Sequence, residues 1–423
     1  MNIAIVGAGI IGVTTAYELA LDGHVVTVFE RHGAVAEETS FANAGVVAPG
    51  YVTPWAAPGM PRKVLGYLFS AHAPVKLSWP LSLHELRWIA AWRRACQPLT
   101  YLANRARLQR LAFYSRQRLH DLTEALQLEY DRSPGYMVLL RAEKERKLMQ
   151  LGLSLLTDAG VRFRELTPEG ARAVEPALNP DANFVGALHL PDDGVANCRQ
   201  FAVLLRKVAQ DCGAVFEFNT TVAPLEAAAP TTLSLQLAGQ PPVQRHFDAV
   251  VMCGGADSAN LMRRLGLRLP LARVHGYSIS APIGEPLNAP RSALMDERYK
   301  VAISRLGQRV RVAGSAELGG RPGERNQAAI NTLYKVLQDW FPGAARLTGS
   351  GAAVQEWKGA RPMLPDGPPV LGASGVPGVW VNLGHGSSGW ALACGSARVV
   401  ADLMGGRDAG IDLEGLGIAR LMA

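Results

Sequence analysis

Residues 2–30 read NIAIVGAGIIGVTTAYELALDGHVVTVFE: an apolar run, a glycine-rich turn, a helical pattern, an Asp-Gly turn and a second apolar run. Short apolar runs bounded by glycine are typical of buried strands, and apolar residues at helical spacing between them predict a helix. The stretch therefore predicts a βαβ unit at the start of an α/β domain.

The turn inside this unit has the pattern G-x-G-x-x-G, formed by Gly7, Gly9 and Gly12. In such a unit the first glycine permits a tight turn, and the second lets the backbone approach a pyrophosphate. The third lets the helix pack against the strand. The N–H groups at the start of the helix, including those of Ile10 and Ile11, then face the phosphates. The turn therefore predicts a dinucleotide site.

The residue that ends the second apolar run narrows the choice of dinucleotide. Glu30 lies 23 positions after Gly7, where a carboxylate accepts hydrogen bonds from an adenosine ribose and disfavours the 2′-phosphate of NADP. NAD and FAD both stay open. After Arg31 the chain continues with ETSFANAG at 38–45 instead of another crossover, and such small and polar residues suit a loop laid against a flat ring system.

A second glycine-rich turn, NLGHGSSGW at 382–390, follows the apolar run VWV and precedes the small residues ALACGSARVV. We expect a strand, a turn and a helix here, with free N–H groups at the helix start and no acidic residue to oppose negative charge. Because the first turn already takes the pyrophosphate, we expect this one to face the other end of the cofactor. If the cofactor is a flavin, such donors stabilise the charge that reduction places on its pyrimidine side.

Length and composition set the broad class. A chain of 423 residues exceeds the size of one hydrophobic core, so we expect two domains. The five cysteines are an odd number without C-x-x-C spacing, which argues against a disulfide framework and against a metal site. We find no signal-peptide pattern and no run of about 18 apolar residues, so we expect a cytoplasmic protein. Peripheral contact with the inner face of the cell membrane stays open.

The net charge of +7 is concentrated in one part of the chain. Between Arg62 and Lys147 there are sixteen Lys or Arg and seven Asp or Glu. The segment at 60–83 mixes cationic, aromatic and aliphatic residues, as membrane-interface segments do; its sequence is MPRKVLGYLFSAHAPVKLSWPLSL. The alternative interpretation of this segment is a solvated helical face that covers the core. The same positive charge is also compatible with a different function, that of a nucleic-acid-binding flavoprotein. A steep salt dependence of nucleic-acid binding would reveal this function.

The middle of the chain predicts a mixed architecture. Residues 62–160 have a mainly helical pattern that YMVLLR at 136–141 interrupts, and 271–316 alternate as antiparallel strands. The strand at 247–252 ends next to Gly254, so glycines again stand where a strand meets a dinucleotide. We expect an α/β plus α+β fold of two interleaved domains. The dinucleotide domain is predicted to comprise 1–60, 165–255 and 345–423, and the substrate domain 61–164 and 256–344.

Four stretches together carry a resemblance to a known family. They are the glycine turn ending at Glu30, ETSFANAGVVAPGYVTPWAAPG at 38–59, GARPMLPDGPP at 359–369 and GHGSSGW at 384–390. The chain resembles the FAD-dependent D-amino acid dehydrogenases of bacteria, within the wider group of D-amino acid, glycine and sarcosine oxidases. The resemblance implies a Rossmann-like FAD-binding domain interleaved with a substrate domain. It also implies oxidation of a D-amino acid to a 2-oxo acid and ammonia, with electrons passed to a quinone or another respiratory acceptor.

The resemblance also implies roles for single residues. By motif, the ADP half of FAD is assigned to Gly7, Gly9, Gly12 and Glu30, and its adenine side to Val222. The residues assigned to the surroundings of the flavin are Ser40, Asn43, Ala44 and Gly45. The residues assigned to the pyrimidine edge of the flavin are Gly384, His385, Gly386, Ser387, Ser388 and Gly389. Arg361 matches the position that anchors the substrate carboxylate beside the flavin. No cysteine lies between Cys253 and Cys394, so the FAD is expected to be non-covalent. Ser387-Ser388 replaces the usual Thr-Leu pair, which puts substrate shape in question.

We expect hydride transfer from the substrate Cα–H to flavin N5, with positioning rather than a protein base supplying most of the catalysis. Tyr277, and after it Tyr51 and Tyr299, are candidates to complete the substrate site, and His385 to hydrogen-bond the cofactor. Proline, hydroxyproline and N-methyl amino acids stay open as substrates. A flavin-fold subunit without its own turnover is a further alternative.

Overall fold

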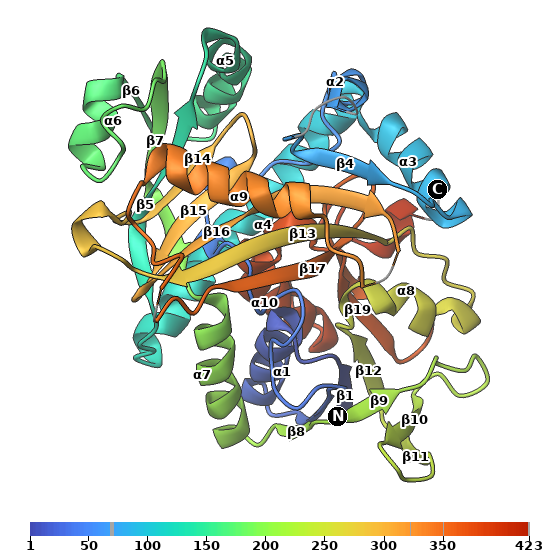
Figure 1. The fold of residues 1–423 in the computed structure, drawn as a ribbon. Coiled ribbons are helices and arrows are strands. Elements are labelled where there is room, and N and C mark those ends of the chain that lie inside the picture. The colour runs from blue at the N-terminus through green and yellow to red at the C-terminus, as the bar shows by residue number, and fades with distance from the viewer. Residues whose placement is uncertain (68–71, 322, 350, 422–423) are drawn as a thin grey trace.

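The computed structural model describes residues 1–67, 72–321, 323–349 and 351–421, and these contain two large β-sheets with helices around them (Figure 1). Part of the predicted interfacial segment at 60–83 therefore lies outside the described residues. The helices are α1 (Ile10–Leu21), α2 (Met60–Tyr67), α3 (Leu83–Ala95), α4 (Pro98–Ala125), α5 (Glu143–Asp158), α6 (Pro168–Val174), α7 (Cys198–Asp211), α8 (Ser258–Leu261), α9 (Gln327–Trp340) and α10 (Gly389–Met404). Short 3-10 turns include η1 (Pro49–Tyr51), η2 (Gly255–Asp257) and η5 (Gly386–Ser388).

The first sheet has six strands and is parallel except at one edge. Its strands are, in sheet order, β18 (Val370–Ala373), β19 (Val379–Leu383), β12 (Ala249–Met252), β1 (Asn2–Val6), β2 (Val25–Phe29) and β8 (Val215–Glu217). The helices α1, α7 and α10 pack on one face of this sheet and share one apolar core with α4. The predicted βαβ unit is thus β1, α1 and β2, and it lies in the middle of the sheet.

The second sheet is larger and mostly antiparallel. Its main path is β17 (Gln355–Met363), β13 (Ala272–Pro282), β16 (Arg309–Gly319), β15 (Val301–Leu306), β14 (Ala293–Asp296), β5 (Arg132–Leu140), β7 (Gly186–Ala196) and β3 (Val46–Val47), with β4 (Val75–Ser78) beside β16 and β6 (Arg164–Leu166) beside β7. Helix α9 packs on one face and closes a second apolar core there. A small third sheet contains β9 (Thr220–Val222), β10 (Thr232–Leu237) and β11 (Val243–His246).

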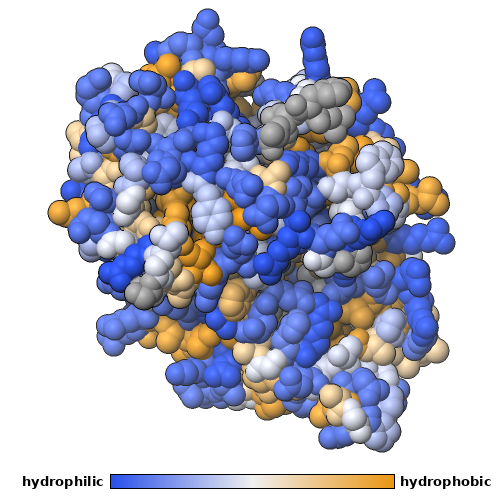
Figure 2. Space-filling view, in the orientation of Figure 1, coloured by the Kyte–Doolittle hydropathy of each residue, from blue (hydrophilic) through white to orange (hydrophobic). Residues whose placement is uncertain are grey.

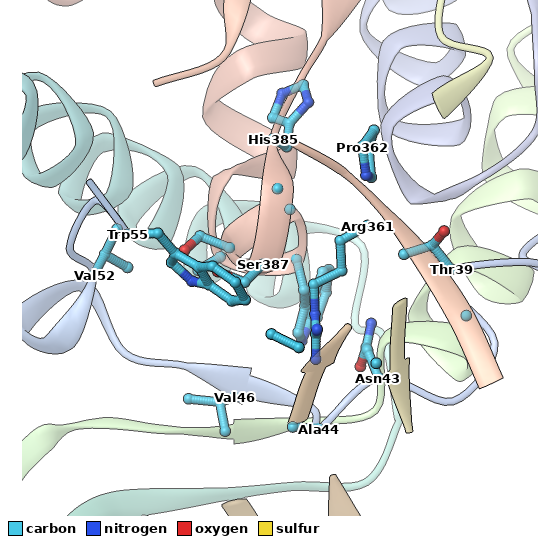
Figure 3. A pocket seen from close by; sticks show the side chains of 18 of the residues that line it. Thr39, Asn43, Ala44, Val46, Val52, Trp55, Arg361, Pro362, His385 and Ser387 are labelled. Carbon is cyan, nitrogen blue, oxygen red and sulfur yellow. The ribbon is translucent and has the colours of Figure 1, made fainter. Parts of the chain in front are cut away.

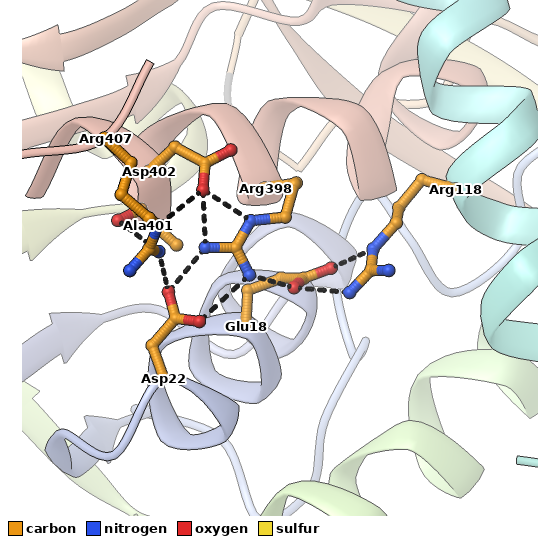
Figure 4. A network of polar contacts seen from close by, with 7 residues as sticks. All are labelled: Glu18, Asp22, Arg118, Arg398, Ala401, Asp402 and Arg407. Atoms are coloured by element: carbon orange, nitrogen blue, oxygen red, sulfur yellow. Dashed lines mark hydrogen bonds and ion pairs between the residues drawn. The ribbon is translucent and has the colours of Figure 1, made fainter. Parts of the chain in front are cut away.

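Small residues let the helices of the first domain approach closely. A Cβ on Gly395 of α10 would lie 2.8 Å from the Ser115 backbone of α4, so only glycine allows this crossing. Close by, Glu18 of α1 is fully buried and accepts hydrogen bonds from Arg118 of α4 and Arg398 of α10 (Figure 4). Asp22 extends the network at the end of α1. Packing and charge therefore hold the N-terminal and C-terminal helices together.

The mixed α/β fold expected from the sequence is confirmed, with local differences. The predicted strand at 136–141 is the second half of β5, and the alternating region 271–316 forms β13 to β16. The pattern at 300–315 contains two strands, because Gly307 adopts a positive φ and turns the chain between β15 and β16. β4 was not predicted, since its four residues lie in a basic, helix-like region.

The predicted domain boundaries stay a prediction. All six strands of the six-stranded sheet lie in the ranges predicted for the dinucleotide domain. However, β3, β7 and β17 belong to the large sheet although their residues lie in those same ranges, because each pairs with a strand of that sheet. No helix within residues 1–67, 72–321, 323–349 and 351–421 combines the length and apolar content needed to cross a bilayer.

Candidate active site

A cavity of about 1350 Å³ opens where the carboxyl ends of β1, β2, β12 and β19 meet the large sheet. Typical small-molecule pockets occupy roughly 300–1,000 Å³, so this volume leaves room for a large ligand and a second molecule. Two residues predicted for the site, Gly12 and Tyr299, do not line the cavity. The others do: Gly7, Gly9, Ile10, Ile11, Glu30, Arg31, Ser40, Asn43, Ala44, Gly45, Tyr51, Val222, Gly254, Tyr277, Arg361, Gly384, His385, Gly386, Ser387, Ser388 and Gly389.

The first glycine turn has the geometry that its sequence predicted. Gly7 adopts φ +100°, and a Cβ there would lie 2.8 Å from the Cys253 carbonyl oxygen. A Cβ on Gly12 would lie 1.9 Å from the Gly7 oxygen, so Gly12 packs the helix on the turn instead of facing the cavity. At Gly9, by contrast, a Cβ would meet only the Ser40 hydroxyl, at 3.5 Å. Gly9 thus leaves open space at the start of α1.

The carboxylate at the end of β2 is held by backbone donors. Ala8 N–H donates to Glu30 Oε2 at 2.8 Å, and His32 N–H donates to Oε1 at 2.9 Å. The Arg31 side chain instead lies at the cavity mouth, where it pairs with Glu38 and, at 2.9 Å, with Asp257. Glu30 is therefore fixed beside the glycine turn.

The segment 38–45 connects the two sheets along the cavity. Ser40 Oγ accepts a hydrogen bond from Ile10 N at 3.1 Å. Thr39 Oγ1 donates to the Ala360 carbonyl of β17 at 2.6 Å. Ser304 Oγ donates to the Ala44 carbonyl at 2.7 Å. In Figure 3, Thr39, Asn43 and Ala44 of this segment lie around the Arg361 side chain.

The second glycine turn follows β19, which β12 separates from β1 in the same sheet, and it lines the same cavity as the first turn. Its Gly384 and Gly386 adopt φ of +81° and +55°, and the first turn of α10 contains no acidic residue. The Asn382 side chain donates to Thr15 Oγ1 of α1 at 2.9 Å. This bond ties the strand before the second turn to the helix after the first.

His385 is buried within this turn, and its Nε2 lies 3.0 Å from Ser396 Oγ of α10. Burial lowers the pKa of His385 to about 3, so the ring is neutral at physiological pH. The ring points away from Arg361 in Figure 3. These contacts favour a packing role for His385 over a catalytic one.

Arg361 lies on β17 with its guanidinium across Gly276 of β13, where a Cβ would come within 2.3 Å of it. Its Nη1 donates to the Ser315 carbonyl at 2.8 Å. Within the described part of the chain no carboxylate pairs with this guanidinium, and burial lowers its pKa to about 10. The cavity therefore contains a partly buried cation with donors free for an anion.

The two cavity tyrosines already have hydrogen-bond partners. The Tyr277 hydroxyl donates to Glu317 and accepts from Asn326 N–H at 3.1 Å. The Tyr51 hydroxyl donates to Glu297 and accepts from Lys300 Nζ at 3.2 Å. Burial, together with the neighbouring carboxylate, raises the pKa of each phenol. Both therefore stay protonated at neutral pH.

Tyr299, the third tyrosine named from the sequence, does not line the cavity. Its ring packs beside the Arg141 guanidinium, which lies 5.2 Å from the ring centre. Sequence reasoning in turn missed Trp55 and Val52, which face the space near Ser387 (Figure 3). Both lie in the stretch 38–59 that carries the family resemblance, and the available signal was an apolar side chain between two prolines.

The family model described as "FAD dependent oxidoreductase" matches residues 2–403. The chain belongs to this family. It is 42% identical over 431 residues to a protein of Cereibacter sphaeroides named D-amino acid dehydrogenase, with 100% of this chain and 96% of the relative covered. A protein of Sinorhizobium medicae with the same name is 41% identical, with 99% and 100% covered. The resemblance found in the sequence is thus confirmed.

Solved structures show the same fold. Glycine oxidase from Geobacillus kaustophilus superposes with a TM-score of 0.76 at 21% identity, covering 99% of this chain and 98% of that one. Iminodiacetate oxidase from Chelativorans sp. gives 0.70 at 20% identity, with 98% of both chains covered. The chain is therefore an FAD-dependent oxidoreductase, and FAD is its cofactor.

The residues present fit this cofactor. Gly9 leaves a gap into which a pyrophosphate can approach α1, while no acidic residue occupies the first turn of α1 or α10. Glu30 lies beside the turn, as a ribose partner requires. The buried cysteine in contact with this region, Cys253, has its pKa raised by burial to about 12 and is an unreactive thiol.

Proposed function

We propose that the protein oxidises D-amino acids to 2-oxo acids and ammonia, and that Arg361 binds the substrate carboxylate. The single observation that carries this proposal is the partly buried Arg361 guanidinium in the cavity, without a carboxylate partner among the described residues. A guanidinium binds a carboxylate through two parallel hydrogen bonds, which fixes orientation as well as position. When bound, FAD supplies the acceptor for the hydride that leaves Cα.

The cofactor-binding roles we propose follow the cavity wall. Gly7, Gly9 and the start of α1 would hold the pyrophosphate, and Glu30 the ribose. The segment 38–45, with Ser40, Asn43, Ala44 and Gly45, would lie along the flavin, and the turn 384–389 would donate to its pyrimidine edge. Val222 and Gly254 would line the adenine side, with Arg31 closing the mouth.

We propose that no side chain acts as a general base. Tyr51 and Tyr277 donate to carboxylates and have raised pKa values, while His385 is neutral and bonded to Ser396. The amine must therefore arrive deprotonated, and the protein contributes by orienting the substrate and excluding water. This assignment supports hydride transfer rather than abstraction of the Cα proton.

Anaerobic reduction of the purified holoenzyme tests the proposal. We expect D-alanine to bleach the flavin rapidly and L-alanine, L-proline and N-methylglycine to bleach it slowly or not at all. A panel in which no D-amino acid reduces the flavin would sink the proposal. Bleaching by L-proline or N-methylglycine alone would favour the alternative substrate classes.

We also propose a quinone or another respiratory molecule as the electron acceptor, reached at the membrane surface. Six of the fourteen exposed large hydrophobic residues in the described chain lie in one basic region: Leu65, Trp79, Leu83, Leu86, Leu99 and Leu102. The exposed Arg87, Arg93 and Arg94 lie among them in sequence. Figure 2 shows apolar and hydrophilic residues intermingled over the part of the surface that α2, β4 and α3 form. Such a mixture suits an anionic lipid surface.

Sedimentation with vesicles tests the membrane contact. We expect the protein to pellet with vesicles containing phosphatidylglycerol at low salt. The double variant Leu83→Glu, Leu99→Glu should stay in the supernatant while keeping its flavin. Equal sedimentation of both proteins would contradict the proposal, as would binding to neutral vesicles alone.

A further inference from the structure

The cavity is also lined by residues of α4, α5, β5 and β14, and we call the part that these residues line the distal lobe. Its walls are largely apolar, and the lining residues are Tyr101 and Arg105 of α4, Leu148, Met149, Gly152, Leu153 and Leu156 of α5, Tyr136 of β5 and Met295 of β14. The residues assigned to FAD and to the substrate carboxylate come from other elements. The distal lobe therefore lies outside the site described so far.

Arg105 is a buried cation in this lobe. It is only 5% exposed, and its one hydrogen bond runs from Nη2 to the Gly152 carbonyl at 3.4 Å. Its Nε has no hydrogen-bond partner, and no acidic side chain within residues 1–67, 72–321, 323–349 and 351–421 pairs with it. The Arg105 guanidinium has five N–H donors, and among the described residues it makes a single, long hydrogen bond.

The acidic residues near the lobe already have partners. Glu145 pairs with Arg298 at 2.8 Å, and Glu297 pairs with Lys300. Asp193, beneath Gly50, lies 3.5 Å from Arg116. None of these carboxylates is left to balance the charge of Arg105.

Tyr136 adds a second unpartnered group. It is 1% exposed, and its hydroxyl has no hydrogen-bond partner among the described residues. Its ring lies 5.5 Å from the Tyr51 ring, and it shares an apolar cluster with Leu153, the residue that follows Gly152. Arg105 and Tyr136 therefore both line the distal lobe, each with a polar group that has no partner.

Leaving these groups buried without partners costs free energy. A buried donor without an acceptor destabilises the folded state, and an unpaired buried charge destabilises it more. Arg105 is the one charged residue among those that define the lobe. A neutral carbonyl ligand would satisfy the donors but leave the charge unbalanced, whereas a carboxylate would meet both needs.

We propose that the distal lobe is a second carboxylate-binding subsite, in which Arg105 and the Tyr136 hydroxyl bind an anionic oxygen pair while α5 packs against the apolar part of the ligand. The carboxylate has two candidate sources. It is either the side chain of an acidic amino acid substrate, an option that rests on the proposed function, or a separate monocarboxylate that binds together with the substrate.

Two measurements on the holoenzyme distinguish these sources. The first is the ratio of kcat/KM for D-glutamate to that for D-glutamine, which differ at the side-chain carboxylate. The second is the number and affinity of hexanoate molecules bound per chain by calorimetry. In Arg105→Met we expect either the ratio or the affinity of one hexanoate site to fall roughly ten- to hundred-fold, the loss of a charge-assisted pair. A changed ratio identifies the substrate side chain, and a lost hexanoate site identifies a separate molecule.

Tyr136→Phe separates binding from folding. Removing an unpartnered hydroxyl should leave Tm unchanged or raise it, while carboxylate binding weakens several-fold. Lys147→Met is the matched control, because Lys147 is an exposed cation on α5 outside the cavity lining. If both readouts in Arg105→Met and Tyr136→Phe equal those of the wild type, the subsite does not exist. A wild type that D-alanine fails to reduce would refute the proposed function but leave the hexanoate measurement readable.

Discussion

Replacing Gly9 by alanine separates cofactor binding from folding at the first glycine turn. Gly9 has φ −66° and ψ 178°, a conformation open to alanine, and its new Cβ would touch only Ser40 Oγ at 3.5 Å. We therefore expect the apoprotein to fold normally. Because alanine restricts the unfolded chain, the free energy of unfolding should stay equal or rise by about 0.4–1 kcal/mol.

In the proposed binding mode, the same methyl group occupies the space through which the pyrophosphate of FAD reaches the start of α1. Forcing an extra methyl into a packed contact costs typically about 1–3 kcal/mol. Since about 1.4 kcal/mol corresponds to a tenfold change in Kd, we expect Gly9→Ala to weaken FAD binding roughly five- to 150-fold.

Titration of the apoprotein with FAD, followed by the change in flavin fluorescence, measures this loss directly. Thermal unfolding at a fixed FAD concentration provides an independent measure, since a ligand stabilises the native state by RT ln(1 + [L]/Kd). The Tm increase produced by FAD should therefore shrink in Gly9→Ala while the Tm of the apoprotein does not fall.

Two further glycine variants serve as controls. Gly33→Ala places a Cβ 3.6 Å from Asn219 Oδ1, outside the cavity lining, and should change neither quantity. Gly12→Ala places a Cβ 1.9 Å from the Gly7 oxygen and should destabilise the apoprotein itself. If Gly9→Ala binds FAD within twofold of the wild type, or unfolds as easily as Gly12→Ala, the steric reasoning is wrong.

Three other perturbations follow from the structure. Arg361→Met should lower kcat/KM for D-alanine roughly ten- to hundred-fold or more, and Arg361→Lys should lower it less. Stopped-flow measurement of flavin reduction by D-alanine, at equal flavin content, tests this. Equal reduction rates in both variants and the wild type would show that Arg361 does not bind the carboxylate. Glu18→Gln weakens the buried contacts with Arg118 and Arg398 (Figure 4), so it should lower the free energy of unfolding in urea by about 3–5 kcal/mol. A decrease below about 1 kcal/mol would contradict the importance of this network. The lowered pKa of His385, about 3, means that below pH 6.5 the unfolded state binds a proton that the native state excludes. The stability that the neutral His385 ring contributes is complete at neutral pH and falls by about 1.4 kcal/mol per pH unit as the pH decreases below 6.5. Between pH 7 and pH 5, the free energy of unfolding in urea should therefore fall by about 2 kcal/mol more in the wild type than in His385→Asn. Equal decreases in the two proteins would contradict the burial of a neutral ring.

The parts of the fold and site that could be predicted from the sequence share a local cause. The first turn is specified by glycine spacing, because Gly7 and Gly12 meet in one short segment. The approximate position of Glu30 follows from the βαβ frame in the same way. Local sequence could not place Arg361 across Gly276, since that contact depends on the pairing of β17 with β13.

Arg105 and Tyr136 were missed for a related reason. Within its basic helical region Arg105 looks like any solvated arginine, and Tyr136 looks like a strand residue of the core. Their lack of partners becomes visible only once α4, α5 and β5 are placed around the cavity. Sequence patterns report which groups are present, whereas the absence of a partner is a property of the assembled structure.

The two glycine turns form a single site because side chains join them directly. Thr14 Oγ1 of α1 lies 3.3 Å from the Ala393 carbonyl of α10, and Asn382 bonds to Thr15. Each turn supplies donors to only part of the cavity, so a ligand that spans both binds well only when α1 and α10 are packed together. On the proposed assignment of both turns to FAD, binding of FAD and packing of these helices are thermodynamically linked, and each stabilises the other. The buried charge at Glu18 and the close contact at Gly395 lie where α1, α4 and α10 pack together, so we expect both to affect this linkage.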